Sequence, residues 1–346
     1  MPAYLLSFSK GFRIGYRSPE RMIPTVTLLR AVISVSAVSG DFNLLSSVLN
    51  GQIGLCMLPL ASSNGYIKPL VPINLNFVAR VFDLVTERKG MSIQRKAERY
   101  STLSASLEFV KALNASVSEG ELPKIENLAG ILGNQVNAKN VMSGEVIFYS
   151  RNEKLEDDVK VIIPRRVSEH RNTIDRLTGA ATPFVVTYMQ VSKLVLLANV
   201  PKGLEQQLEK ALALLGEMGV GGLRSRGLGR FTLEKIKLPP EDEQVLGKIV
   251  PITIAPCNRY ALVFGELPLS WDAVEWKNSF FDLQVITGYA GPSYAQVLFG
   301  PLIVTRPGAV VKIGDCSKTH EVERIEIGER LLPSTFVFVP LVIAGE

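Results

Sequence analysis

The residues best suited to bind an anion lie close together in the stretch 219–231. It reads Gly-Val-Gly-Gly-Leu-Arg-Ser-Arg-Gly-Leu-Gly-Arg-Phe, and so contains five glycines and three arginines. Glycine permits positive φ angles and close backbone approach, and the forked arginine guanidinium matches a phosphate. We expect the glycine N–H groups to converge on phosphate oxygens, with the arginine and serine side chains adding contacts to phosphate or sugar hydroxyls. The predicted binding residues are Gly219, Gly221, Gly222, Arg224, Ser225, Arg226, Gly227, Gly229 and Arg230.

The elements on either side of this stretch decide what kind of loop it is. Apolar residues between 204 and 218 recur at helical spacing, and residues 231–236 roughly alternate between apolar and polar, as in a strand. The order is therefore helix, loop, strand, whereas dinucleotide and nucleoside triphosphate loops run from a strand into a helix. A nucleotide-hydrolase loop is excluded. A tight turn with merely solvated arginines is the other interpretation.

A second basic segment covers residues 165–176 and contains four arginines, a histidine and an asparagine. Guanidinium planes can stack on splayed bases, and asparagine can pair with base edges. The alternative is an exposed hairpin in which Glu169 and Asp175 neutralise part of the charge, and Asp175 is equally suited to capping a turn. The candidate RNA-contacting residues are Arg165, Arg166, His170, Arg171, Asn172 and Arg176.

Three further segments carry weaker signals. Residues 12–17 follow the first predicted strand and combine aromatic, glycine and arginine residues, which makes Arg13 a candidate RNA contact beside the more ordinary interpretation of core and turn. Arg95, Lys96 and Arg99 lie on a polar stretch that we expect to be a solvated helix face. The tyrosines of residues 288–294 could stack on bases, but a hinge loop at a subunit contact is preferred.

Together these motifs resemble the RAMP superfamily of CRISPR-associated RNA-binding proteins, whose signature is a glycine-rich loop before the last strand of a ferredoxin-like domain. Residues 171–181, Arg-Asn-Thr-Ile-Asp-Arg-Leu-Thr-Gly-Ala-Ala, resemble the "IDR-TG-A" segment of the large RAMP subunits in type III effector complexes. Residues 12–15, 68–72 and 94–100 are weaker matches, in the order expected of the Csm-type subunit that holds the 5′ tag of the guide RNA. The resemblance covers roughly residues 1–236.

The resemblance implies an α+β fold of tandem ferredoxin-like (RRM-like) domains, with the glycine-rich loop between the last helix and last strand of the first. We assign residues 1–238 to that domain, with a helical insertion, and residues 245–346 to a second, reduced, β-rich domain. In the first domain, strands are predicted at 4–8, 146–150, 184–190, 193–199 and 231–236, and helices at 26–36, 43–50, 102–113, 125–132 and 204–218. In the second, strands are predicted at 259–266, 297–299, 309–313 and 335–342.

The composition fits this assignment without proving it. The 346 residues carry 38 Lys and Arg against 33 Asp and Glu, a formal net charge of +5, so local patches must serve a polyanionic partner. Mean hydropathy is +0.20, which suggests faces buried against other subunits, although a well-packed monomer would also account for it. We expect no membrane span and no signal peptide, and therefore a cytoplasmic protein. Cys56, Cys257 and Cys316 imply neither a disulfide framework nor a metal site, and no cofactor is expected.

The sequence thus predicts a non-catalytic RNA-binding subunit of a type III CRISPR ribonucleoprotein acting in antiviral defence. It would hold the 5′ tag of the guide (cr)RNA and bridge the large signalling subunit to the backbone RAMP subunits. A RAMP endoribonuclease using His170 as general base is one alternative, although catalysis also needs a group to stabilise or protonate the leaving oxygen. The two-domain length argues against the smaller backbone subunit that cuts target RNA. An RNA-independent assembly scaffold is the remaining alternative.

Overall fold

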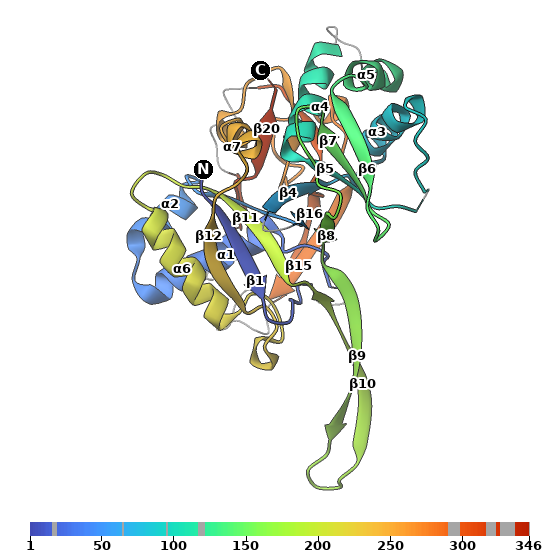
Figure 1. The fold of residues 1–346 in the computed structure, drawn as a ribbon. Helices are drawn as coiled ribbons and strands as arrows, with labels where there is room; N and C mark the ends of the chain where they lie inside the picture. Colours follow the sequence, from blue (N-terminus) through green and yellow to red (C-terminus); the bar gives the residue numbers. More distant parts are fainter. Residues whose placement is uncertain are drawn as a thin grey trace.

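The computed structural model describes residues 1–15, 19–63, 66–94, 96–116, 122–289, 298–315, 323–325 and 336–345. Helices and sheets are mixed throughout this part of the chain, which confirms the predicted α+β class (Figure 1). The strands form two four-stranded sheets, one six-stranded sheet and three two-stranded ribbons.

The first four-stranded sheet has the order β12-β1-β11-β2, and every neighbouring pair in it is antiparallel. Helices α1 and α2 lie between β1 and β2 in the chain, and helix α6 lies between β11 and β12. The apolar side of α6 is buried in a core with α1 and the sheet, as its helical spacing of Leu208, Leu212 and Leu215 predicts. The bounds are β1 Ala3–Phe8, α1 Thr25–Ser39, α2 Phe42–Leu49, β2 Gly54–Leu58, β11 Lys193–Asn199, α6 Glu205–Met218 and β12 Phe231–Ile236.

The long insertion between β2 and β11 forms the six-stranded sheet, ordered β6-β7-β5-β4-β3-β8, together with three helices. Neighbouring strands in this sheet pair antiparallel, except that β5 and β7 pair parallel. The predicted insertion helices are confirmed as α4 and α5. The bounds are β3 Leu60–Ser63, β4 Tyr66–Pro72, α3 Asn76–Arg88, β5 Arg99–Thr102, α4 Leu103–Ser116, α5 Ile125–Leu132, β6 Val136–Asn140, β7 Val146–Ser150 and β8 Lys160–Ile162.

A long antiparallel hairpin of β9 (Arg165–Ile174) and β10 (Ala181–Gln190) completes the insertion. It extends away from the body of the molecule, and only its base lies near the first sheet (Figure 1). The predicted strand 184–190 is the body-proximal part of β10.

The C-terminal part is rich in strands, as predicted. Its four-stranded sheet has the order β13-β20-β14-β17, which differs from the strand order of the first sheet. A short helix, α7, lies at the boundary between the two predicted domains, and the strand predicted at 335–342 is divided into β19 and β20. The bounds are α7 Pro240–Leu246, β13 Ile249–Pro251, β14 Arg259–Val263, β15 Leu283–Tyr289, β16 Leu298–Thr305, β17 Val310–Ile313, β18 Glu323–Ile325, β19 Phe336–Phe338 and β20 Leu341–Ala344.

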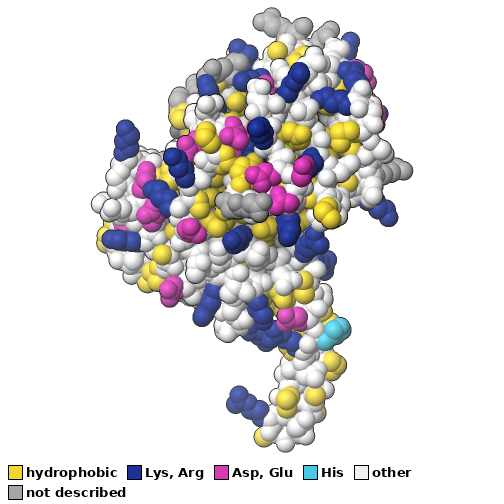
Figure 2. Space-filling view, viewed as in Figure 1, with side chains coloured by type: hydrophobic (Ala, Val, Ile, Leu, Met, Phe, Trp, Pro, Cys, Tyr) yellow, Lys and Arg dark blue, Asp and Glu magenta, His cyan; other side chains and the backbone are white. Residues whose placement is uncertain are grey.

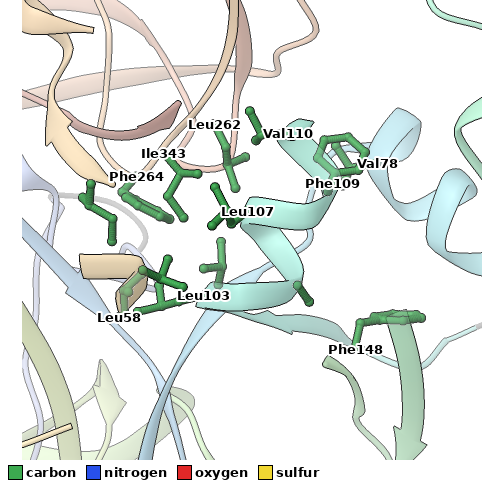
Figure 3. Close-up of a cluster of buried hydrophobic side chains, with 14 of the residues drawn as sticks. Leu58, Val78, Leu103, Leu107, Phe109, Val110, Phe148, Leu262, Phe264 and Ile343 are labelled. Atoms are coloured by element: carbon green, nitrogen blue, oxygen red, sulfur yellow. The ribbon is translucent and has the colours of Figure 1, made fainter. Parts of the chain in front are cut away.

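One hydrophobic core joins both sides of the predicted domain boundary. It contains Leu58 of the first sheet, α4 of the insertion, and Leu262, Phe264 and Ile343 of the C-terminal part. Figure 3 shows Leu103 and Leu107 of α4 within the same cluster as these side chains. The division into 1–238 and 245–346 stays a prediction, but the two parts share a continuous interior.

A buried charge cluster also links the insertion to α7. Lys68 is fully buried and forms ion pairs with Glu153, Glu241 at 3.3 Å and Asp242 at 3.6 Å. Burial raises the pKa of the Asp242 carboxyl to about 7, because the effect of burial is larger than the opposing effect of the Lys68 charge. The cluster gives the Lys68–Pro72 segment, singled out by resemblance, a structural role at this junction.

Two predictions are corrected by the structure. Residues 96–98 are not helical, and Arg99 begins strand β5. The Arg99 guanidinium forms an ion pair with Asp83 at 2.7 Å, and so is not simply solvated. Arg95 lies outside the described residues. Cys257 is disulfide-bonded, a pairing that sequence spacing alone could not reveal. Within the described ranges, no helix is long and apolar enough to cross a membrane.

Candidate functional site

The glycine-arginine loop, residues 219–230, connects α6 to β12, as predicted. The chain leaves the helix through Gly219 and Gly221, at φ angles of 81° and 85°. It then forms one turn of 3₁₀ helix, Arg224–Arg226, before two more glycines with positive φ, Gly227 and Gly229, lead into the strand. Four of the five glycines thus adopt a backbone conformation that a side chain would disfavour.

The N–H groups of these glycines are directed at protein carbonyls. Gly222 donates to Arg13 O at 2.8 Å, and Gly229 donates to Gly11 O at 2.7 Å. Gly219 and Gly227 donate to carbonyl oxygens of α6 and of the 3₁₀ turn, at 2.7 and 2.9 Å. The expectation that these four N–H groups converge on a phosphate is therefore wrong for this conformation. The segment that follows β1 accepts from Gly222 and Gly229, and α6 and the 3₁₀ turn accept from Gly219 and Gly227.

Close packing against that segment explains why glycines are needed. A Cβ atom on Gly221 would lie 2.4 Å from Arg13 O, and one on Gly229 would lie 2.0 Å from Val220 O. A Cβ on Gly227 would meet nothing within 4 Å. The glycines therefore determine the shape of the loop and allow the backbone of Arg13 to lie beside it. Anion binding by the loop must then rely on its side chains.

The arginine side chains of the loop are exposed and project from this rigid backbone. Arg224, Arg226 and Arg230 form no ion pair with any described residue, and the loop itself contains no Asp or Glu. Ser225 is exposed between the first two. Three uncompensated charges on a fixed turn make a surface that attracts a polyanion.

The base of the hairpin packs directly on this loop. Val186 and Tyr188 of β10 are buried in a small cluster with Leu228 of the loop. The guanidinium carbon of Arg226 lies 5.7 Å from the centre of the Phe184 ring, within range of a cation–π contact. The two basic segments predicted separately are therefore parts of one surface, which we call the loop–hairpin surface: residues 219–230 and 165–190.

The register of the hairpin gives its two faces different roles. Directly opposed residues share a face, so Glu169 and Arg171 lie with Val186 and Phe184 on the side toward the loop. Arg171 forms an ion pair with Glu169 at 2.6 Å, and the Tyr188 hydroxyl donates to Glu169 at 2.7 Å. These hydrogen bonds, first from Tyr188 and then from Arg171, lower the pKa of Glu169. Arg171 is thus partly neutralised, as the salt-bridged alternative predicts.

The other face of the hairpin is exposed and largely unpaired. Arg166, His170 and Asn172 alternate along it, and none has a hydrogen-bond or ion-pair partner among the described residues. Arg165, on the loop-facing side, pairs with Glu145 at 3.2 Å. Of the four arginines predicted in β9 and its turn, Arg166 and Arg176 are therefore the two that remain uncompensated within the described chain.

The tip of the hairpin is a side-chain-stabilised turn. The Asp175 carboxylate accepts from the N–H groups of Leu177 at 2.8 Å and Thr178 at 3.0 Å, and Gly179 has a φ of 69°. Both hydrogen bonds lower the pKa of Asp175, and the one from Thr178 has the larger effect. The structural alternative for Asp175 is confirmed, and the turn presents Arg176 and the fully exposed Leu177 at the far end of the hairpin.

A groove opens at the hairpin base, with a volume of about 540 Å³. Arg21, Lys96, Arg165 and Arg166 line it, beside the acidic Glu98 and Glu145. Lys and Arg side chains gather around this part of the molecule in Figure 2. The groove extends the basic surface from the hairpin toward the body.

Sequence reasoning missed the residues that join the two segments. Phe184, Val186 and Tyr188 were predicted only as strand residues, yet their shared face is what seats Leu228 and Arg226. Period-two spacing could have placed them on one face, but nothing in the sequence identifies the loop as their partner. His320 and residues 290–294 of the tyrosine-containing segment lie outside the described residues. Among described residues no group of three or more His, Cys, Asp or Glu could hold a metal ion.

Comparison with known proteins agrees with the resemblance expected from the sequence. Residues 89–232 match the family model of the RAMP superfamily, and this span includes the whole hairpin and the loop. The predicted resemblance to the RAMP superfamily is therefore confirmed. No curated protein matches the chain.

Among solved structures, the first described here shows a shared fold. The chain is similar to one in the crystal structure of the Csm3-Csm4 subcomplex of the type III-A CRISPR-Cas interference complex, with 14% identity, 99% of each chain covered and a TM-score of 0.51. A chain of the Csm1-Csm4 cassette in complex with cA4 has 14% identity, covering 100% of this chain and 98% of that one, with a TM-score of 0.46. A chain of a type III-B Cmr-beta complex has 13% identity over 68% of this chain and 96% of its own, with a TM-score of 0.28.

Proposed function

We propose that this chain, whose residues 89–232 match the family model of the RAMP superfamily, is a non-catalytic RNA-binding subunit of a type III CRISPR ribonucleoprotein. In this role it holds the 5′ tag of the guide RNA on the loop–hairpin surface. It also bridges the large signalling subunit to the backbone RAMP subunits. The observation that carries the proposal is the set of uncompensated arginines on the loop and on the hairpin whose base packs against it.

The charge arrangement supports a single-stranded, phosphate-rich ligand. Five arginines of the surface lack an acidic partner among the described residues: Arg166, Arg176, Arg224, Arg226 and Arg230. They extend from the hairpin tip to the loop, and so can follow a strand's backbone without reading its sequence. The Ser225 hydroxyl and Asn172 amide add neutral groups suited to a 2′-OH and a base edge.

The fold supports the same assignment. The first sheet has the order β12-β1-β11-β2, with helices after its first and third strands in chain order. This is the β-α-β-β-α-β connectivity of a ferredoxin-like domain, with the insertion placed between its second and third strands. We propose that this domain is the RNA-binding unit and that the C-terminal β-rich part is its reduced companion.

The absence of catalysis is part of the proposal. A ribonuclease of this type needs a base to activate the 2′-OH and a second group at the leaving oxygen. His170 lies on the exposed face of the hairpin opposite Val185, and no described acidic side chain hydrogen-bonds to it. That setting favours contact with RNA over cleavage of it.

The partners follow from the proposed complex. The solved chains of similar fold come from a Csm3-Csm4 subcomplex and a Csm1-Csm4 cassette. We propose that this chain likewise assembles with other CRISPR effector subunits, and that the guide RNA joins them on the loop–hairpin surface.

Native purification followed by sequencing of bound small RNA tests the proposal. We expect guide RNAs that share one 5′ end, and we expect them to be lost when Arg224, Arg226 and Arg230 are all replaced by Ala. A control with Lys202, Lys210 and Lys237 replaced by Ala removes the same three charges from exposed positions elsewhere and should retain the RNA. An RNA-free but stable assembly would favour the scaffold, and freshly cut ends that depend on His170 would favour the nuclease.

A further inference from the structure

A cavity of about 260 Å³ lies where the separate sheets of the molecule meet. Its walls come from β2 of the first sheet, β4 and β5 of the insertion, the segment after β14, and the β15–β16 ribbon with the loop after it. Cavities at such junctions are common ligand sites. The loop–hairpin surface described above does not include it.

Much of the cavity wall is apolar. Five prolines line it, together with two methionines: Pro24, Pro59, Pro72, Pro164, Pro307, Met22 and Met57. Proline rings lose little rotamer freedom when they are covered, and methionine adapts to an aromatic neighbour. The volume is below that of sites for drug-sized ligands, and so suits one planar ring system.

A few polar groups converge on this apolar space. Glu266 is 3% exposed and caps the start of α1, where it accepts from the Val26 N–H at 3.5 Å. Glu20 is half-buried and its carboxylate makes no hydrogen bond among the described residues. Arg306 is exposed at the lining, and its guanidinium has no ion pair there. The cavity thus offers hydrogen-bond acceptors inside and a cation at its margin.

The cavity adjoins the groove at the hairpin base. Arg21, Ile163 and Pro164 line both of them. A strand lying on the loop–hairpin surface could therefore direct one nucleotide from the groove into the cavity without leaving the basic surface.

We propose that this cavity binds one nucleobase that carries an amino donor, with the adjoining phosphate at Arg306. The ring lies between the proline and methionine walls, and its amino group donates to Glu20. A carboxylate acceptor matches the cytosine N4 amino group, whereas uracil presents a carbonyl oxygen at the same position. This inference rests on the proposed RNA binding and adds base selection to it.

A comparison of oligo(C) with oligo(U), each of twelve nucleotides, tests the proposal because the two share a backbone and differ at that donor. We expect the wild-type protein to bind oligo(C) about tenfold more tightly, the value of one hydrogen bond to a charged group. Asn74→Trp, which places an indole at the cavity lining, should abolish the preference. Asn76→Trp, exposed and outside the cavity, is the matched control and should keep the preference.

The outcomes separate this inference from the proposed function. Equal affinity for both strands in the wild-type protein would overturn base selection and leave RNA binding intact. Failure to bind either strand would overturn the proposed function itself. Glu20→Gln should reduce the preference, because the amide is no longer a charged acceptor for the cytosine amino group and its own NH2 can donate to the uracil carbonyl oxygen. Calorimetry with CMP identifies the source of the base. If CMP binds the wild-type protein and Asn74→Trp removes this binding, a free nucleotide is also a ligand of the cavity. If CMP does not bind but the oligo(C) preference remains, the cavity takes a nucleotide that is part of the strand.

Discussion

At the scale of single residues, the loop separates two roles that its sequence combines. The glycines permit close packing against residues 11–14, and their N–H groups are used within the protein. The arginines are the groups left to meet a ligand. A Gly-Arg-rich stretch alone could not show this division, because it depends on which carbonyls the loop meets in the folded chain.

Two glycine substitutions should differ in cost for this reason. Gly227→Ala places a Cβ in open space at positive φ, and should lower the free energy of unfolding by about 1 kcal/mol. Gly221→Ala adds a collision with Arg13 O, and should lower it by more than about 2 kcal/mol. Urea unfolding of both variants checks the difference, and equal costs would contradict the packing role given to Gly221.

The buried carboxyl of Asp242 should make stability depend on pH. Its pKa is raised from 3.8 to about 7 in the folded protein, so the unfolded chain releases this proton first as the pH rises. The contribution to stability is complete below about pH 4 and is lost as the pH passes through about 7. Asp242→Asn should therefore flatten the decline in unfolding free energy between pH 4 and 7, by at most about 1.4 kcal/mol per pH unit. The charged groups facing it, Lys68, Glu153 and Glu241, are unchanged in this variant. Identical pH profiles for variant and wild type would contradict the burial argument.

At the scale of elements, the hairpin is the most independent part of the described chain. Its outer half has exposed side chains on both faces, while its inner half is seated on the loop through Tyr188 and Val186. Removing the outer half should therefore cost little stability, but should remove Asn172 and Arg176 from the proposed RNA surface.

Replacement of residues 172–183 by Asn-Gly tests this division. The pair Arg171 and Phe184 would then flank a two-residue turn that suits an antiparallel hairpin. We expect an almost unchanged melting temperature and a several-fold loss of affinity for single-stranded RNA. Unchanged affinity would confine the binding surface to the hairpin base and the loop.

The sequence was informative about elements and less so about their contacts. Helix α6 and strands β1, β7, β11 and β12 follow from clear periodicity, and their predicted positions are confirmed. Residues 96–98 were expected to be helical from their charge pattern, but the following strand β5 is held by pairing with β4 and β7, which no local pattern shows. The seating of the hairpin on the loop was likewise beyond prediction, because it joins residues about forty apart through side chains of ordinary strand type.

At the scale of the whole molecule, the shared core implies cooperative unfolding of the two predicted domains. Apolar side chains of helix α4, the first sheet and the C-terminal sheet belong to one buried cluster (Figure 3). Both tryptophans of the chain, Trp271 and Trp276, lie in the C-terminal part, whereas all the α-helices except α7 lie within residues 1–238 in the described chain.

Tryptophan fluorescence and far-ultraviolet circular dichroism therefore report on different parts. We expect their urea transitions to coincide in the wild-type protein, and to shift together in Phe264→Ala, which should cost about 3–5 kcal/mol. Two separated transitions would contradict the continuous core.

The most direct test of the central claim is the salt dependence of RNA binding. If four to six phosphates are neutralised, log affinity for single-stranded RNA should fall with log salt at a slope of about −3 to −4. Replacement of Arg224, Arg226 and Arg230 by Ala should make that slope shallower by about 2, whereas the matched Lys202, Lys210 and Lys237 control should not change it. A flat salt response in the wild-type protein, or equal slopes in the wild type and the arginine variant, would contradict RNA binding by the loop–hairpin surface.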